Sequence, residues 1–241
     1  MSAAPPTFDV TLRSARMLTP SVRELTFQRA DGEPVTFDAG QWMSFVLPLA
    51  EGEARRAYSI ASPPDGDTFD IAVTHVDGGP GSTYLHALEP GATLRAIGPQ
   101  GFFTRPRSDD APALFIATGT GVTPLRSMVR DALAHGHVKP MIVLVGVREE
   151  QDRLYREELE ALAAAHPQLR VEYTLSRGKD DWTGRRGYVQ THVPELFREL
   201  EPSGAPHAWI CGLERMVSAV RNVLRKDMSL PRQQVHSERY D

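Results

Sequence analysis

The hydrophobic pattern changes near residue 110, and this change constrains the fold more than any other feature of the chain. Before it, short runs of β-forming residues are separated by turns such as Asp31-Gly32 and Pro63-Pro64-Asp65-Gly66. After it, apolar strand-like runs alternate with helical segments. The polar, proline-bounded stretch Arg105–Pro112 lies at the change. We therefore predict one domain over residues 1–107 and a second over residues 108–241.

The first domain carries short strands at the spacing of a small barrel. One helix is predicted at Ser82–Leu88, where Ser82 can act as the N-cap. The predicted strands are Phe8–Met17, Val22–Gln28, Trp42–Leu47, Ala57–Ala61, Phe69–Val76 and Thr93–Ile97. The pattern indicates an N-terminal antiparallel six-stranded β-barrel.

The second domain alternates strands with helices, which is typical of an α/β doubly wound parallel sheet. The strands are predicted at Ala113–Ala117, Pro140–Val147, Leu169–Leu175 and Ala208–Cys211, and the helices at Pro124–His135, Gln151–Ala165, Val193–Leu200 and Leu213–Lys226. Such a sheet binds ligands at the carboxyl ends of its strands.

Composition excludes several classes of protein. The net charge of −4 argues against a nucleic-acid binder, which needs a basic face. No apolar run approaches the roughly 18 residues of a membrane span, and Met1–Pro6 has no signal-peptide pattern, so a cytoplasmic protein is expected. Cys211 is the only cysteine, which rules out an internal disulfide and a cysteine-ligated cluster in this chain. The scattered histidines give no metal-binding pattern, so no metal site is predicted.

A glycine loop, Gly119-Thr120-Gly121-Val122-Thr123-Pro124, joins the first strand of the second domain to a helix. Gly119 and Gly121 permit a tight turn and a close backbone approach, and Pro124 suits the first helical position. Backbone N–H groups at such a helix start can hold a pyrophosphate. The alternative is an ordinary strand-to-helix turn.

A second cluster, Arg56-Ala57-Tyr58-Ser59, lies on a predicted strand, where Arg56 and Tyr58 share one face. Arginine can make paired hydrogen bonds to a phosphate, and tyrosine can pack flat on an aromatic cofactor. The alternative is a surface arginine beside a half-buried core tyrosine. The glycine-rich stretch Gly78–Ser82 before the short helix is a further candidate for anion binding.

These motifs, with Cys211-Gly212 and the terminal Glu238-Arg239-Tyr240, resemble in type and order those of the ferredoxin-NADP reductase superfamily. The family combines an FAD-binding barrel with a nicotinamide-nucleotide domain, and the resemblance covers nearly the whole chain. Arg56–Ser59 is similar to its R-x-Y-S/T flavin motif, and Gly119–Pro124 to its G-T-G-x-x-P nucleotide loop.

The resemblance implies roles for individual residues. In the first domain Arg56 would bind the FAD pyrophosphate, Tyr58 would pack on the flavin, and Ser59 would hydrogen-bond the flavin N5 edge. Gly81 and Ser82 would complete the phosphate cradle, with Thr74 and Val76 beside the cofactor. Tyr240 is a candidate lid over the flavin, and the alternative is a frayed tail.

In the second domain the NAD(P)H pyrophosphate would face Thr118, Gly119, Gly121 and Thr123. Cys211 and Glu238 would border the nicotinamide, so Ser59, Cys211 and Glu238 form the predicted catalytic set. For Cys211 the alternative is an inert buried residue.

The nicotinamide cofactor is predicted to be NADPH, with NADH as the alternative. Ser176, Arg177, Arg186 and Tyr188 could bind a 2′-phosphate and stack on adenine, a pattern that looks like the NADPH site of plant-type members. Trp182-Thr183-Gly184 in the same loop is instead similar to NADH-using oxygenase reductases.

The function that the resemblance implies is hydride transfer between NAD(P)H and FAD, with single electrons passed to a separate acceptor. Ferredoxin or flavodoxin is the first expectation, and an oxygenase component is the close alternative. A reductase of free flavin or ferric chelates, and a non-catalytic flavin-binding module, are the other candidates.

Overall fold

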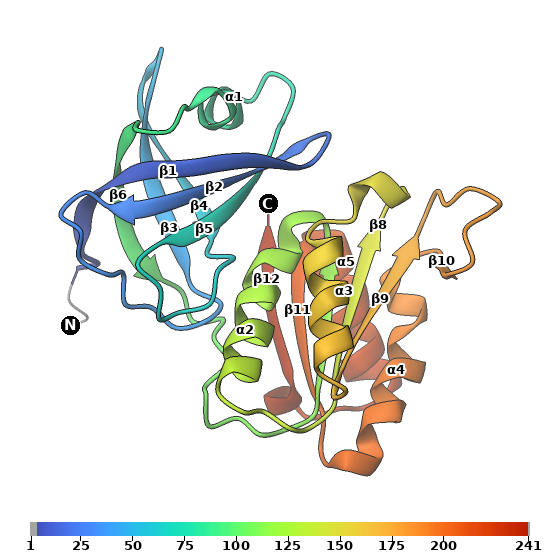
Figure 1. Ribbon diagram of the computed structural model, residues 1–241. Helices are drawn as coiled ribbons and strands as arrows, with labels where there is room; N and C mark the ends of the chain where they lie inside the picture. Colours follow the sequence, from blue (N-terminus) through green and yellow to red (C-terminus); the bar gives the residue numbers. More distant parts are fainter. Residues whose placement is uncertain (1–3, 241) are drawn as a thin grey trace. The chain divides into compact units, whose positions relative to one another are not determined.

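The chain folds into two units, which the computed structural model describes for residues 4–240 (Figure 1). Residues 1–3, part of the segment considered above for a signal peptide, lie outside this range. One unit contains the residues up to Pro106 together with Arg126–Asp131, and the other contains Arg107–Leu125 and the residues from Ala132 onward. The division predicted after residue 107 stays a prediction.

The first unit is a six-stranded antiparallel sheet in the order β4-β3-β6-β1-β2-β5. Its elements are β1 (Thr7–Thr19), β2 (Val22–Arg29), β3 (Trp42–Leu49), β4 (Gly52–Ser59), β5 (Phe69–Thr74), α1 (Pro80–Ala87) and β6 (Thr93–Gln100). The Ala61 N–H, just past β4, donates to the Asp70 carbonyl of β5 over 2.8 Å, which joins the two outer strands. The predicted antiparallel six-stranded architecture is confirmed.

Alternating side chains from these strands fill the interior of the first unit. The rings of Phe27, Phe45 and Phe69 lie with centroids 5.1 to 6.4 Å apart, within the range of favourable aromatic contacts. Arg126 is almost fully buried and donates to the Ala61 carbonyl over 2.7 Å, with Asp70 at 3.5 Å. The chain that follows β4 is therefore fixed by a buried charge-assisted hydrogen bond.

The second unit is a six-stranded parallel sheet in the order β10-β9-β8-β7-β11-β12. Its strands are β7 (Ala113–Thr118), β8 (Met141–Val147), β9 (Leu169–Leu175), β10 (Arg185–Arg186), β11 (His207–Leu213) and β12 (Val235–Tyr240), and its helices are α2 (Val122–Ala134), α3 (Arg156–Ala165), α4 (Val193–Leu200) and α5 (Glu214–Asn222). Apolar side chains of α4 and α5 pack on one face of β7, β8 and β11, and α3 lies on the other face (Figure 1). The predicted parallel α/β sheet is confirmed.

Several element boundaries differ from the sequence expectation. The helix predicted at Gln151–Ala165 begins only at Arg156, because Tyr155 has a left-handed backbone (φ 54°) that a right-handed helix cannot contain. A separate 3₁₀ turn, Glu150–Asp152, precedes it and is closed by a capping box between Glu149 and Asp152. In the first unit β4 runs over Gly52–Ser59 rather than Ala57–Ala61, since it pairs with all of β3.

The C-terminal part of the second unit also differs. Leu213 ends β11 instead of opening a helix, and α5 ends at Asn222, with the π-helical turn Val223–Asp227 following. The last strand, β12, was not predicted. It pairs in parallel with β11, with Cys211 opposite Glu238. The terminal Glu238-Arg239-Tyr240 is therefore part of a sheet and not a frayed tail.

Among residues 4–240, no helix is both long and apolar enough to cross a lipid bilayer.

Acid should destabilise the second unit through His236 on β12. Its ring stacks on Trp209 at 3.9 Å, and its Nε2 lies 3.3 Å from Nδ1 of His207, which in turn faces Asp109 at 3.8 Å. Burial, and then the charge of His207, lower the pKa of His236. The folded state thus binds this proton less readily than the unfolded state, so stability is lost as the pH falls below the ordinary histidine value of about 6.5.

The melting temperature of the unmodified protein should fall between about pH 7.5 and about pH 5.5. We expect this decrease to be smaller in His236→Phe, which keeps a ring against Trp209 but has no group to protonate. Calorimetric melting of both proteins at the two pH values measures this. An equal fall in the variant would contradict the assignment.

Candidate nucleotide-binding sites

The glycine loop of the second unit requires a residue without a side chain at Gly121. A Cβ there would lie 2.2 Å from the carbonyl oxygen of Cys211 and 2.8 Å from Cα of Gly212, both at the end of β11. Gly119 has a left-handed φ of 53° with open space around it. Pro124 is the third residue of α2 rather than the first. Proline is still tolerated there, because an N–H in the first turn of a helix has no hydrogen-bond partner within the helix. At Gly119 and Gly121 the loop therefore presents backbone atoms and no side chain.

Thr118 directly precedes the loop and Thr123 lies within it, and their hydroxyl groups differ in hydrogen bonding. Oγ1 of Thr118 is buried and has no hydrogen-bond partner in the described part of the chain. The Thr123 hydroxyl donates to the Thr120 carbonyl over 2.8 Å and so holds the turn in place. An unpaired hydroxyl, bare backbone and the start of a 13-residue helix together fit an anion such as a pyrophosphate.

Cys211 lies at the carboxyl end of β11 and is fully buried. Burial raises the pKa of its thiol far above the usual value; a hydrogen bond to Tyr240 opposes this rise, and the charge of Glu238 adds to it. The thiol therefore remains protonated at neutral pH. The Tyr240 hydroxyl also lies 3.4 Å from Oγ1 of Thr123. Four predicted site residues, Thr123, Cys211, Glu238 and Tyr240, are thus brought together within the second unit.

The loop between β9 and α4 contains the residues predicted to choose the nicotinamide cofactor. Arg177 and Tyr188 are exposed, and Ser176 directly follows β9. Arg186 is occupied, because its guanidinium donates to the backbone carbonyls of Gly178, Lys179, Asp180 and Trp182. In the structure the Arg186 side chain therefore stabilises the conformation of the loop. Its contact with a phosphate stays a prediction.

Trp182 packs inside this loop. Its indole N–H donates to the Arg185 carbonyl over 2.8 Å, and the Arg153 guanidinium lies 5.2 Å from its ring centre. A Cβ on Gly184 would meet the ring at 2.3 Å. Trp182, which belongs to the Trp182-Thr183-Gly184 motif, and Arg153, which no sequence motif had assigned to the loop, therefore fix its shape.

In the first unit, Arg56, Tyr58 and Ser59 lie along β4. Arg56 is exposed, Tyr58 is partly buried against Phe45 with ring centroids 6.2 Å apart, and Ser59 is buried. Burial raises the pKa of Tyr58, and the positive charge of Arg56 opposes this. The tyrosine hydroxyl stays protonated and can act as a hydrogen-bond donor.

The start of α1 lies against Arg56. A Cβ on Gly81 would be 3.2 Å from both Cγ and Nε of Arg56, so the small residue lets the guanidinium approach the helix start. The Ser82 hydroxyl accepts from the Val76 N–H over 3.1 Å and donates to the Gly79 carbonyl over 3.0 Å, which stabilises the loop before the helix. Thr74 ends β5, and both it and Val76 are exposed. An arginine beside an N-terminal turn fits a bound phosphate.

Arg126 is a residue that the sequence analysis missed. It holds the Ala61 carbonyl two residues after Ser59 and thereby positions the end of the flavin motif. A signal was present, since Arg126 is a charged residue between the apolar positions Leu125 and Met128 of a predicted helix. Its partner could not be read from the sequence because that partner is a backbone oxygen.

Two family models match the chain. The oxidoreductase FAD-binding domain matches residues 9–104, and the oxidoreductase NAD-binding domain matches residues 115–222. Each match covers one of the two predicted nucleotide sites, which agrees with the predicted cofactors.

Similar proteins cover nearly the whole chain. Ferredoxin--NADP reductase B of Sorangium cellulosum is 59% identical over 238 residues, which are 97% of this chain and 98% of the relative. The phenol hydroxylase P5 protein of Acinetobacter pittii is 31% identical over 97% of this chain, which spans only 65% of that protein. The crystal structure of a cytochrome P450 reductase from Amycolatopsis superposes with a TM-score of 0.83 at 28% identity, covering 99% of this chain and 71% of that one.

Replacing Gly121 should disrupt the second unit more than replacing Gly119. We expect Gly121→Ala to cost about 2–3 kcal/mol, because the added methyl overlaps a backbone carbonyl. Gly119→Ala meets only the strain of a left-handed backbone, about 1 kcal/mol. Urea unfolding of both variants gives the comparison, and equal losses would contradict the close approach at Cys211.

The raised pKa of Cys211 predicts an unreactive thiol in the native protein. At about pH 8 we expect iodoacetamide to label it at least about a hundredfold more slowly than the urea-unfolded chain. Mass spectrometry of timed samples measures both rates. Fast native labelling would show that the thiol is accessible and partly ionised.

Proposed function

The chain belongs to the ferredoxin-NADP reductase superfamily, and on that premise we propose that it oxidises NADPH and passes the electrons, through bound FAD, to a ferredoxin. An FAD-dependent NAD(P)H oxidoreductase is what the family and both domain matches establish. The 59% identical relative, whose name states both ferredoxin and NADP, supports the choice of both. Flavodoxin as acceptor and a cytoplasmic location stay predictions.

Bound FAD supplies a ring that accepts a hydride from the reduced nicotinamide and can give up electrons one at a time. The residues of this chain bind the cofactors and orient them. Arg56, beside the bare backbone of Gly81, offers paired donors to the flavin-side phosphates. Tyr58 offers an aromatic face, and Ser59 a hydroxyl whose place is set by the buried Arg126 bond two residues on.

In the second unit the loop at Gly119–Gly121 would bind the pyrophosphate of the pyridine nucleotide through backbone N–H groups. Cys211 serves as a small neutral group beside it, because the raised pKa of its thiol keeps a negative charge away from the site. Glu238, opposite Cys211 in the register of β11 and β12, is the acidic group available to hold a proton there.

The single observation that carries the NADPH proposal is the position of Arg177. It follows the carboxyl end of β9, its side chain is exposed, and its backbone N–H is fixed by the Arg148 carbonyl at 2.9 Å. The neighbouring loop is held by Arg186 and Trp182. An exposed arginine on a fixed backbone suits a dianionic 2′-phosphate.

A second candidate is the reductase component of an oxygenase system. It is favoured by the 31% identical phenol hydroxylase protein. This chain spans 65% of that relative, and its single cysteine cannot hold an iron–sulfur cluster. Electrons would therefore leave these 241 residues for an acceptor outside them in either case.

Steady-state turnover with NADPH and with NADH tests the proposal. We expect NADPH to be preferred, and Arg177→Ala to raise the KM for NADPH about tenfold while the KM for NADH stays within about twofold. Lys139→Ala removes an exposed charge before β8, at the opposite end of the strands, and should change neither value.

Reduction of a purified ferredoxin by NADPH completes the test. A preference for NADH that Arg177→Ala leaves intact, together with reduction of an oxygenase component but not of ferredoxin, would support the second candidate instead.

A further inference from the structure

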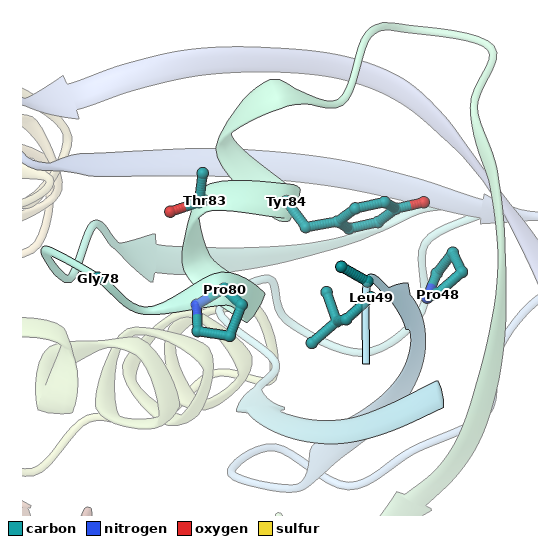
Figure 2. A pocket seen from close by; sticks show the side chains of 7 residues that line it. Pro48, Leu49, Gly78, Pro80, Thr83 and Tyr84 are labelled. Atoms are coloured by element: carbon teal, nitrogen blue, oxygen red, sulfur yellow. The ribbon is translucent and has the colours of Figure 1, made fainter. Parts of the chain in front are cut away.

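The start of α4 holds the edge strand β10 of the second unit. The strand contains two residues, Arg185 and Arg186, which pair with Thr174 and Leu175 of β9. A strand this short has few ladder hydrogen bonds of its own, so side chains have to fix its place. The open pocket of the first unit (Figure 2) has no such separate role, because it lies at the start of α1 and adjoins the predicted flavin-phosphate contact.

Arg185 joins β10 to α4 and to β9 through two carboxylates. Its guanidinium makes two hydrogen bonds to Glu195 of α4, of 3.0 and 3.1 Å, and its Nε donates to Glu172 of β9. Paired hydrogen bonds from an arginine to a carboxylate fix orientation as well as adding energy. The buried side chains of Leu196 and Phe197 anchor α4 in the core of the second unit. Arg185 therefore ties the edge strand to the core.

His192, the N-cap residue of α4, completes the attachment. Nη1 of Arg185 lies 3.4 Å from Nδ1 of the ring, and because a guanidinium only donates, Nδ1 is the acceptor. The ring proton is then on Nε2, which donates to the Arg186 carbonyl over 3.0 Å and lies 3.1 Å from the Thr174 hydroxyl. That hydroxyl donates to the Gly187 carbonyl over 3.0 Å. Each residue from Arg185 to Gly187 is therefore bonded to His192 or to β9.

This attachment fixes the backbone that carries Tyr188. On one side the Gly187 N–H donates to the Leu175 carbonyl over 3.0 Å, and on the other the Thr191 hydroxyl donates to the Tyr188 carbonyl over 2.7 Å. The Tyr188 side chain itself is 63% exposed. An exposed aromatic ring on a backbone held from both sides can stack on a base with little further ordering of the loop.

We propose that Arg185 and His192 are positioning residues for the pyridine nucleotide, which hold the Tyr188 ring where it meets the adenine without touching the nucleotide themselves. The inference rests on the proposed function and on the predicted role of Tyr188. It is separate from the role of Arg177, whose N–H is held by the Arg148 carbonyl and not by β10. Adenine is common to NADPH and NADH, so loss of the attachment should weaken the binding of both nucleotides alike.

Steady-state turnover of the flavin-loaded full chain with each nucleotide tests this. We expect His192→Phe, which removes both ring nitrogens, to raise the KM for NADPH and the KM for NADH about fivefold each while kcat stays within about twofold. His192→Gln, whose amide can replace the Nε2–H donor, should keep both KM values within about twofold of the unmodified chain. The control His166→Phe makes the same change in the turn before β9, at the opposite end of that strand, and should change neither KM.

A double-mutant cycle shows whether His192 acts through Tyr188. In the Tyr188→Ala background, His192→Phe should raise either KM by no more than about twofold further, because the ring that it positions is gone. Arg185→Met should match His192→Phe in both backgrounds. Its control, Arg170→Met, removes an ion pair between β9 and Glu199 near the other end of α4 and should change neither KM.

Unchanged KM values in both His192→Phe and Arg185→Met would overturn the proposal, and so would a full additional rise in the Tyr188→Ala background. A loss of kcat in both variants would overturn it too, since the two residues would then serve the fold rather than the nucleotide. A rise in the KM for NADPH alone would assign them to the 2′-phosphate instead of the adenine. Failure of the unmodified chain to oxidise either nucleotide would contradict the proposed function itself.

Discussion

The close approach of two backbone segments organises the second unit. Gly121 lies where any side chain would collide with the Cys211 carbonyl, so the loop after β7 rests directly on the end of β11. This contact sets the start of α2 and leaves Oγ1 of Thr118 buried without a partner in the described chain. It also brings Thr123 near Tyr240, whose hydroxyl in turn bonds Cys211. The loop predicted to bind the pyrophosphate and the residues predicted to border the nicotinamide therefore both depend on the absence of a side chain at Gly121.

The first unit also depends on a glycine near the start of a helix, in this case Gly81 of α1. Gly81 is small enough for Arg56 to lie against the start of α1, and the loop before it is held by Ser82 rather than by a bulky side chain. In both units a glycine lies at or just before a helix start, where an anion is favoured.

The sequence predicted those parts of the molecule that strong local patterns determine. The helix Val193–Leu200 was placed at its observed bounds because its apolar residues repeat at helical spacing and Pro194 suits the first turn. The glycine loop was found for a similar reason, since Gly119 and Gly121 are needed by the backbone itself. The strand β12 was missed because Val235-His236-Ser237-Glu238-Arg239-Tyr240 is largely polar, and only its pairing with β11 makes it a strand. The shaping role of Arg186 could not be predicted either, because its acceptors are carbonyls that converge only in the folded loop.

As an FAD-dependent NAD(P)H oxidoreductase, the chain must bind a flavin and a pyridine nucleotide and let a hydride pass between them. Anaerobic titration of the flavin-loaded protein with NADPH tests it most directly. We expect the yellow flavin absorbance to bleach with one NADPH consumed per bound FAD. A protein that takes up no flavin, or whose flavin spectrum neither NADPH nor NADH alters, would contradict it.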